Sequence, residues 1–145
     1  MISYSLAINE DRKEISNLLT LATLPTDDIK INRHHFIVAK TENIVVGCIG
    51  LEGYSNIGIL RSFAVDERYR NQKIGKNLIS QLTNYALQKG ITKLYLLTTT
   101  ASKYFSREGF EVIDRNIVPE LIQKTSEFKY LCPSEAICMY KTIAL

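Results

Sequence analysis

The sequence predicts a single α+β domain over residues 1–145, with a mixed, mostly antiparallel sheet of six to seven strands flanked by helices. Apolar strand patterns at residues 36–39, 44–51 and 57–65 follow one another across short polar turns, which favours antiparallel neighbours. A helical pattern and a buried strand at residues 93–98 come next, and they form a β-α-β unit with residues 57–65. Such a unit makes its two strands parallel and its crossover right-handed.

The first elements are a strand and one or two helices. Apolar residues alternate from Ile2 to Ile8, which is the period of a strand. Asn9 is placed to cap a helix whose apolar stripe runs from Ile15 to Ala22, and Pro25 ends it. A second short helix is predicted over residues 26–31. Residues 40–43 and 53–56 are the turns between the three strands that follow.

The C-terminal half alternates helices and strands. The long helix over residues 72–89 ends at Gly90, a favourable residue just past a helix. A short helix over residues 101–108, a strand at 110–113, a small helix beginning at Pro119 and a last strand at 136–141 follow. The predicted order is β-α-α-β-β-β-α-β-α-β-α-β, which excludes a doubly wound sheet and a helical bundle.

Composition and charge exclude several classes of protein. Lysine and arginine number 18 against 15 acidic residues, and this net charge of +3 is too small to indicate a nucleic acid partner. No apolar run of about 18 residues is present to span a membrane. Cys48, Cys132 and Cys138 lack the paired spacing of a metal site. Unpaired cysteines and an N-terminus unlike a signal peptide predict a cytoplasmic protein without a metal.

The strongest functional signal lies in residues 60–78, where a strand ends, a short loop follows and a helix begins. A helix start offers unpaired N–H groups and a positive dipole end, which together can bind a phosphate. Gly75 permits close approach of a ligand to the backbone, and Arg70, Lys73 and Lys76 add positive charge. From these residues alone, two alternatives stay open: a phosphate site, or a solvated helix entry.

Residues 70–75, RNQKIG, resemble motif A of the GNAT acetyltransferases, whose pattern is Gln/Arg-x-x-Gly-x-Gly/Ala. They match at Arg70 and Gly75 and depart at Lys73, where the family usually has glycine. Residues 101–110, ASKYFSREGF, resemble the A-x-x-x-[YF]-x-x-x-G-F segment of that fold. Further pieces, above all YLLTTTA at 95–101 and LCPS at 131–134, resemble the ArsN2-type branch, which is associated with arsenic-resistance operons.

The resemblance implies the GNAT fold and acetyl-CoA as cosubstrate. In the family, the amine attacks the thioester directly. The pantetheine amides pair with the strand that precedes the loop, and the pyrophosphate lies on the amides of the loop. The cofactor-binding residues implied here are Phe63, Ala64, Val65, Arg70, Asn71, Gln72, Lys73, Ile74, Gly75 and Lys76.

Three residues are candidates for the acceptor side. Glu52 follows the apolar strand at 47–51 and can serve as the base that deprotonates the amine; alternatively it is an exposed turn glutamate. Arg61 interrupts an apolar strand, so it either clamps a substrate carboxylate or points to an exposed sheet face. Tyr54 is a candidate for substrate binding or a loop aromatic on the surface.

The acid that protonates the leaving thiolate is less defined. The family's tyrosine lies four residues before the glycine of Gly-Phe, and here that residue is Phe105. Its neighbour Tyr104 points about 100° away on a helix, so either Tyr104 is displaced into the site or another group or water supplies the proton. Cys132 is interpreted as a small buried residue rather than a nucleophile.

The sequence therefore predicts an N-acetyltransferase that moves an acetyl group from acetyl-CoA to a small, amino-acid-like amine, with a link to arsenic resistance. Two alternatives stay open. One is a non-catalytic acyl-CoA sensor, which the missing tyrosine at Phe105 allows. The other is an acetyltransferase of protein N-termini or lysines. A monomer or homodimer is expected.

Overall fold

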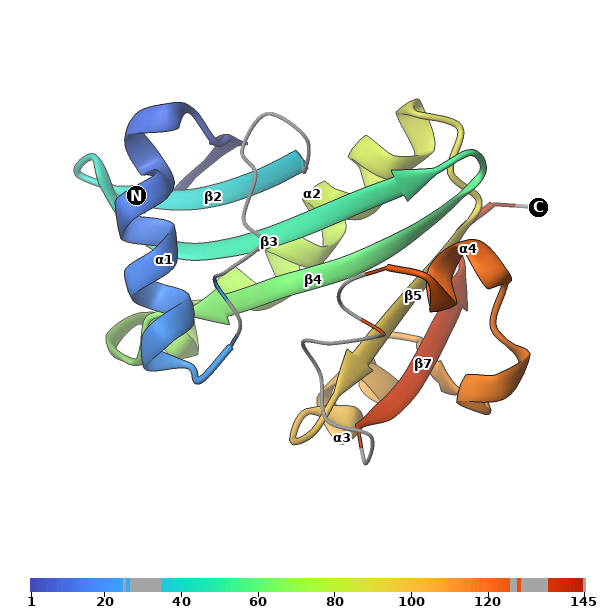
Figure 1. Ribbon diagram of the computed structural model, residues 1–145. Coiled ribbons are helices and arrows are strands. Elements are labelled where there is room, and N and C mark those ends of the chain that lie inside the picture. The colour runs from blue at the N-terminus through green and yellow to red at the C-terminus, as the bar shows by residue number, and fades with distance from the viewer. Residues whose placement is uncertain (25, 27–34, 126–127, 129–135, 145) are drawn as a thin grey trace. The chain divides into compact units, whose positions relative to one another are not determined.

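The computed structural model describes residues 1–24, 26, 35–125, 128 and 136–144. Its strands form a seven-stranded sheet in the order β1-β2-β3-β4-β5-β7-β6 (Figure 1). The predicted α+β class is confirmed. The elements are β1 (Ser3–Leu6), η1 (Asn9–Asp11), α1 (Arg12–Leu21), β2 (His35–Thr41), β3 (Ile44–Tyr54), β4 (Ile57–Val65), η2 (Glu67–Gln72), α2 (Ile74–Gln88), β5 (Lys93–Thr98), α3 (Ser102–Arg107), β6 (Glu111–Val112), η3 (Arg115–Ile117), α4 (Glu120–Gln123) and β7 (Ile137–Thr142).

The chain divides into two compact units. The N-terminal unit comprises Met1–Glu52 and Leu60–Tyr85, and the C-terminal unit comprises Gly53–Ile59 and Ala86–Leu145. Because β3, β4 and α2 each cross a boundary between these ranges, both units are built from segments that are not contiguous in sequence.

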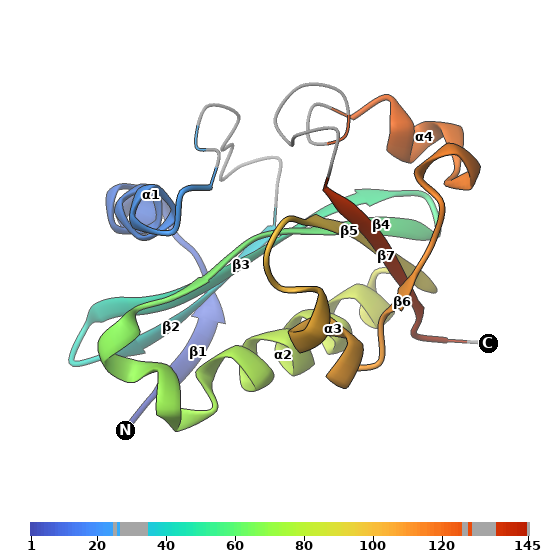
Figure 2. The same cartoon turned by 90° about the horizontal axis from the view of Figure 1, so that it is seen from below.

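The N-terminal unit packs a helix on each face of its strands. β1, β2 and β3 are joined by antiparallel pairing, and Figure 2 shows α1 and α2 on opposite faces of them. The apolar stripe of α1 buries Ile15, Leu18 and Leu19 against the sheet. On the opposite face, Leu78 and Leu82 of α2 are fully buried. The sheet residues that pack with α1 are Phe36, Val38, Val45, Cys48 and Ala64.

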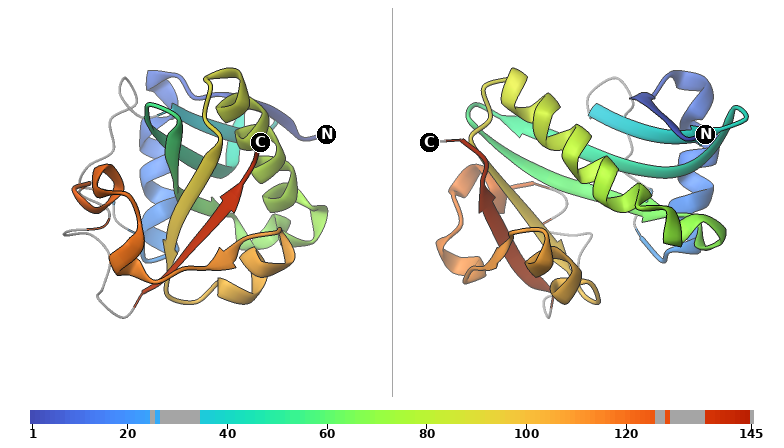
Figure 3. Two further views of the ribbon diagram at one scale, coloured as in Figure 1. Left: turned by 90° about the vertical axis from the view of Figure 1, so that its right-hand side faces the viewer. Right: turned by 180° about the vertical axis from the view of Figure 1, so that it is seen from behind.

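The C-terminal unit contains the parallel pair that the sequence predicts. Residues 57–59 of β4 pair in parallel with residues 93–95 of β5, and β5 then pairs antiparallel with β7. The short strand β6 pairs with β7. Figure 3 shows α3 and α4 on opposite faces of β5 and β7. The apolar cluster that includes α4 is formed by Ile59, Tyr95, Val118, Ile122, Phe128 and Cys138.

Several predicted boundaries are wrong by a few residues. Asn9 does not cap α1; it opens η1, and the Asp11 carboxylate accepts a hydrogen bond from the Ile8 N–H at 2.9 Å. The strand predicted at 44–51 extends to Tyr54, because Glu52 is buried within it. Pro119 precedes α4 as its cap residue rather than beginning it. Apart from Thr26, the predicted helix at 26–31 lies outside the described residues.

The close packing of α2 on β3 depends on a residue without a side chain. A Cβ atom on Gly47 would lie 3.1 Å from both Ile74 Cγ2 and Leu78 Cδ1, tighter than ordinary van der Waals contact. Ile74 and Leu78 are fully buried, so neither side chain can turn out to solvent. Gly47, between Val46 and Cys48, thus allows α2 to pack closely against β3.

We predict that Gly47→Ala lowers the free energy of unfolding by about 1–3 kcal/mol, because the added methyl group overpacks this contact. Urea denaturation measures the change. Gly53→Ala is the matched control, since its Cβ would meet only Ile91 Cδ1, at 3.3 Å. Equal stability of the two variants would show that α2 moves away from β3 at no cost.

Candidate functional site

The loop between β4 and α2 is tied to the sheet at its first residue. The Asp66 N–H donates to the Val46 carbonyl at 2.8 Å. The Asp66 carboxylate accepts hydrogen bonds from Arg68, at 3.0 Å from the backbone N–H, 3.2 Å from Nε and 2.9 Å from Nη2. These bonds hold the pKa of the Asp66 carboxyl below its usual value. The loop therefore begins from a fixed, charged turn.

Lys73 makes the connection between η2 and α2. Its backbone is left-handed, with φ 60° and ψ 23°. This is the position where the GNAT pattern usually has glycine, and glycine is the residue that adopts this conformation at least cost. A lysine here costs roughly 1–2 kcal/mol relative to an unstrained residue. The chain thus keeps a backbone turn suited to glycine while presenting a cationic side chain.

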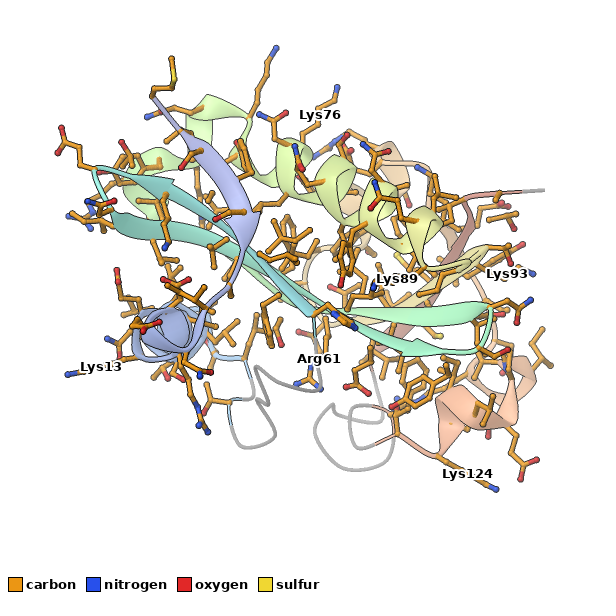
Figure 4. The ribbon with its side chains drawn as sticks, turned by 90° about the horizontal axis from the view of Figure 1, so that it is seen from above. Lys13, Arg61, Lys76, Lys89, Lys93 and Lys124 are labelled. Atoms are coloured by element: carbon orange, nitrogen blue, oxygen red, sulfur yellow. The ribbon has the colours of Figure 1, made fainter. Side chains whose placement is uncertain are left out.

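The helix start is basic and anchored. Ile74 is fully buried, which fixes the first turn of α2 against the core. Lys73 and Lys76 are exposed, and among the described residues they form no ion pair. Figure 4 shows the Lys76 side chain extending away from α2. Arg70 Nη1 lies 3.8 Å from Glu67 Oε1, and both side chains are mostly exposed, so this ion pair contributes little to stability. The first turn of α2 therefore presents N–H groups beside two uncompensated positive charges.

Arg61 and Glu52 form a buried ion pair between β4 and β3. Arg61 Nη1 lies 2.5 Å from Glu52 Oε1, and the two side chains are 0% and 6% exposed. Of the two interpretations of Arg61, the exposed sheet face is therefore excluded. Glu52 is not an exposed turn residue either. Figure 4 shows the Arg61 side chain on the side of the sheet away from α2.

Ser62 carries a second irregularity of the backbone, within β4. Its φ is +53°, which is unusual for a residue other than glycine in a strand. Arg61 Nε donates to Ser62 Oγ at 3.1 Å, and Cys48 Sγ donates to the Ser62 carbonyl at 3.4 Å. Burial raises the pKa of the Cys48 thiol to about 12, so the thiol keeps the proton that it donates. No pattern in the sequence indicated the left-handed backbone of Ser62 or its contact with Cys48, because backbone handedness leaves no trace in hydropathy.

The remaining candidates lie in the C-terminal unit. Phe105 is buried, and its ring packs edge-on against Phe110 at 5.6 Å between centroids. Tyr104 is half-buried and contacts the Phe105 ring edge-on. Burial raises the pKa of the Tyr104 phenol, so it remains a proton donor at neutral pH. Tyr54 is partly buried against the α4 cluster.

Cys132 lies outside the described residues, and Asn71 belongs to η2 by its backbone. Within the described ranges, no group of three or more histidine, cysteine, aspartate or glutamate side chains is arranged to hold a metal ion. In the same ranges, no helix has the length and apolarity needed to cross a membrane.

Comparison with known proteins assigns the fold to a family. A family model described as an acetyltransferase (GNAT) domain matches residues 32–112, more than half of the chain. The chain belongs to the GNAT acetyltransferase family. An amino-acid acetyltransferase of Photorhabdus laumondii is 32% identical over 97 residues, which is 66% of this GNAT chain and 21% of that protein's length. The chain therefore spans about a fifth of the length of this relative.

Solved structures agree on the GNAT fold. N-acetylglutamate synthase from Neisseria gonorrhoeae, crystallised with coenzyme A and L-arginine, superposes with a TM-score of 0.82 at 20% identity. This match covers 97% of the present chain and 33% of the synthase chain. A GNAT-family acetyltransferase from Staphylococcus aureus Mu50 gives a TM-score of 0.78 at 22% identity, with 99% of each chain covered. The ArsN2-type branch is not among these findings.

The left-handed backbone at Lys73 gives a direct prediction. We expect Lys73→Gly to leave the free energy of unfolding unchanged or to raise it by up to about 1 kcal/mol, because glycine removes the left-handed penalty but adds unfolded-state entropy. Lys76→Gly is the matched control. It removes the same charge from a helical residue and should cost about 0.5–1 kcal/mol. Thermal and urea unfolding measure both. Equal losses in the two variants would contradict a strained Lys73.

Proposed function

We propose that this chain is an acetyl-CoA-dependent N-acetyltransferase whose acceptor is the amine of a small, amino-acid-like molecule. The observation that carries the proposal is the left-handed turn at Lys73, which leads into the N-terminal turn of α2 with exposed basic residues beside it. In a GNAT chain, such a turn suits the phosphates of coenzyme A because it offers N–H groups, a helix dipole and positive charge together.

The residues proposed to hold acetyl-CoA all belong to the N-terminal unit. Backbone N–H groups of residues 71–76 receive the pyrophosphate, and the exposed Lys73 and Lys76 add charge. Acetyl-CoA supplies an acetyl group activated as a thioester. The strand residues proposed to pair with the pantetheine amides are Phe63, Ala64 and Val65, and the loop residues are Arg70, Asn71, Gln72, Lys73, Ile74, Gly75 and Lys76.

The amino-acid acceptor rests on two supports. The relative from Photorhabdus laumondii is named an amino-acid acetyltransferase, and the structural neighbour from Neisseria gonorrhoeae is named an N-acetylglutamate synthase. Arg61, whose guanidinium is paired with Glu52, and Tyr54 are the two residues predicted for substrate binding, and both roles belong to this proposal. Holding amine and thioester together accounts for most of the rate, since positioning is worth roughly 7–11 kcal/mol in favourable systems. The base role of Glu52 and the acid role of Tyr104 stay predictions.

The finer predictions belong to this proposal as well. We propose that the chain is a single domain and a monomer or homodimer. We also propose that it is cytoplasmic and has no nucleic acid partner. The ArsN2-type resemblance adds a role in arsenic resistance, which growth of an arsenic-sensitive host on arsenite would test. The acyl-CoA sensor remains the second candidate, because Phe105 is buried among Phe110 and its neighbours and carries no phenol.

Thermal unfolding with acetyl-CoA, coenzyme A and a panel of amino acids is the first test. Ligand at one hundred times its dissociation constant stabilises the folded state by about 2.7 kcal/mol. We expect acetyl-CoA to raise the unfolding temperature, and at least one amino acid to cause release of free coenzyme A. Stabilisation without release by any amine would favour the sensor, and release with peptide amines alone would favour the peptide acetyltransferase. The absence of both effects would reject the acyl-CoA site.

The position of the phosphate site gives a separate prediction. We expect Lys76→Glu to weaken acetyl-CoA binding at least about tenfold at low salt, because it reverses a charge at the first turn of α2. Isothermal titration measures the affinity. Lys13→Glu is the control, since Lys13 is an exposed lysine on α1 (Figure 4). If the two variants bind acetyl-CoA alike, the pyrophosphate does not lie on this turn.

A further inference from the structure

A chain of hydrogen bonds runs from Glu52 to Cys48 through Ser62. Glu52 Oε1 accepts from Arg61 Nη1 at 2.5 Å, and Arg61 Nε donates to Ser62 Oγ at 3.1 Å. The Ser62 carbonyl then accepts from Cys48 Sγ at 3.4 Å. Ser62 is therefore held through its side chain and its backbone by β3 residues, directly or by way of Arg61. All four residues lie in the N-terminal unit.

Ser62 is a residue that needs to be held. A φ of +53° is costly for a side chain other than glycine, and such a conformation persists when its surroundings determine it. Ser62 immediately precedes Phe63, the first of the strand residues proposed to pair with acetyl-CoA. The direction in which the following peptide groups point depends on the backbone angles at Ser62.

Three alternate residues on one face of β3 accommodate the left-handed backbone of Ser62. Cys48 and Glu52 supply the bonds described above. Between them, Gly50 supplies space, because a Cβ atom there would lie 2.9 Å from Phe36 Cε1 and 3.3 Å from both Cγ and the carbonyl oxygen of Arg61. Alternate residues of a strand share a face, so Cys48, Gly50 and Glu52 form one row under Arg61 and Ser62.

We propose that Glu52 and Cys48 are positioning residues, which hold the left-handed backbone of Ser62 and so set the course of β4 through residues 63–65. The proposal rests on the proposed function, because its catalytic consequence is the placement of acetyl-CoA. In this role Glu52 acts through Arg61, which is an alternative to the proton-accepting role that the sequence predicts for its carboxylate. The buried Cys48 thiol, with its pKa of about 12, serves as a permanent donor.

Two substitutions at Ser62 separate backbone geometry from the lost hydroxyl. Ser62→Ala and Ser62→Gly both remove Oγ, but only glycine adopts a positive φ at low cost. Both leave the ion pair of Glu52 and Arg61 intact, so both avoid an unpaired buried charge. We expect kcat to fall about ten- to a hundredfold in Ser62→Ala, as misplacement of reactants does, and to fall less in Ser62→Gly. Equal losses in the two variants would overturn the proposal.

Glu52→Gln tests the roles of the carboxylate as base and as positioning group. A lost base is felt most at low pH, where the amine is protonated, and less as pH rises and free amine becomes available. A lost positioning group lowers kcat by the same factor at every pH. We expect this flat ratio, together with an affinity for acetyl-CoA that changes less than kcat. A ratio of wild-type to variant kcat that shrinks with rising pH would overturn the proposal.

The double variant Glu52→Gln/Ser62→Gly gives the rescue test. Glycine at 62 makes the turn without help from Glu52, so we expect kcat to rise above that of Glu52→Gln alone. No rescue is possible for a missing base. The wild type, Glu52→Gln, Ser62→Gly and the double variant also form a double-mutant cycle in urea unfolding. We expect the changes in the free energy of unfolding at the two sites to be non-additive. Additive effects on both kcat and unfolding would reject the proposal.

Failure of the proposed function gives a different result. If the wild-type chain releases no coenzyme A with any amine, the enzyme assignment fails, and with it the catalytic consequence of the network. The unfolding cycle then decides the structural part alone. Coupling between residues 52 and 62, with Ser62→Ala less stable than Ser62→Gly, supports a network that holds this turn, and no coupling rejects it.

Discussion

Neutralisation of a buried arginine is the constraint on which the N-terminal unit depends. An unpaired guanidinium inside a sheet carries a large desolvation penalty, so Arg61 needs a carboxylate within the same sheet. Glu52 meets that need from the neighbouring strand. The pair then requires room, which Gly50 provides, and a backbone course that brings Arg61 Nε to the Ser62 hydroxyl. A single buried charge thus dictates three further positions on two strands.

Charge pairing also distinguishes the two ends of the loop between β4 and α2. Asp66 neutralises Arg68 at the start of the loop, whereas Lys73 and Lys76 at its end are exposed. A helix N-terminus already carries partial positive charge, and lysines there raise it further, which is unfavourable for the isolated helix. An arrangement that is unfavourable alone becomes favourable when an anion binds. This is the physical basis of the proposal that the loop binds a phosphate rather than serving only as a solvated helix entry.

Periodicity and punctuation in the sequence predicted most of the fold. The two-residue period of the strands and the helical stripe of residues 74–86 depend on local spacing, and the parallel pair follows from the length of the crossover. The errors lie at Asn9, Glu52 and Pro119, where tertiary contacts decide boundaries. Glu52 is polar and precedes a glycine, so it looks like a turn residue until its partner Arg61, nine positions away, is known. The left-handed backbone at Ser62 and Lys73 could not be predicted from hydropathy either, because hydropathy carries no information on backbone angles.

Because the two units interleave along the sequence, the chain cannot be divided at one point into two complete units. The N-terminal unit needs residues up to Tyr85, while the C-terminal unit draws on Gly53–Ile59 from within that span. No single break point yields two fragments that each hold a complete unit. A break after Tyr85 leaves the N-terminal unit complete but deprives the C-terminal unit of Gly53–Ile59, and an earlier break divides the N-terminal unit itself. Exchange of either unit with a relative therefore requires both of its segments to be exchanged together.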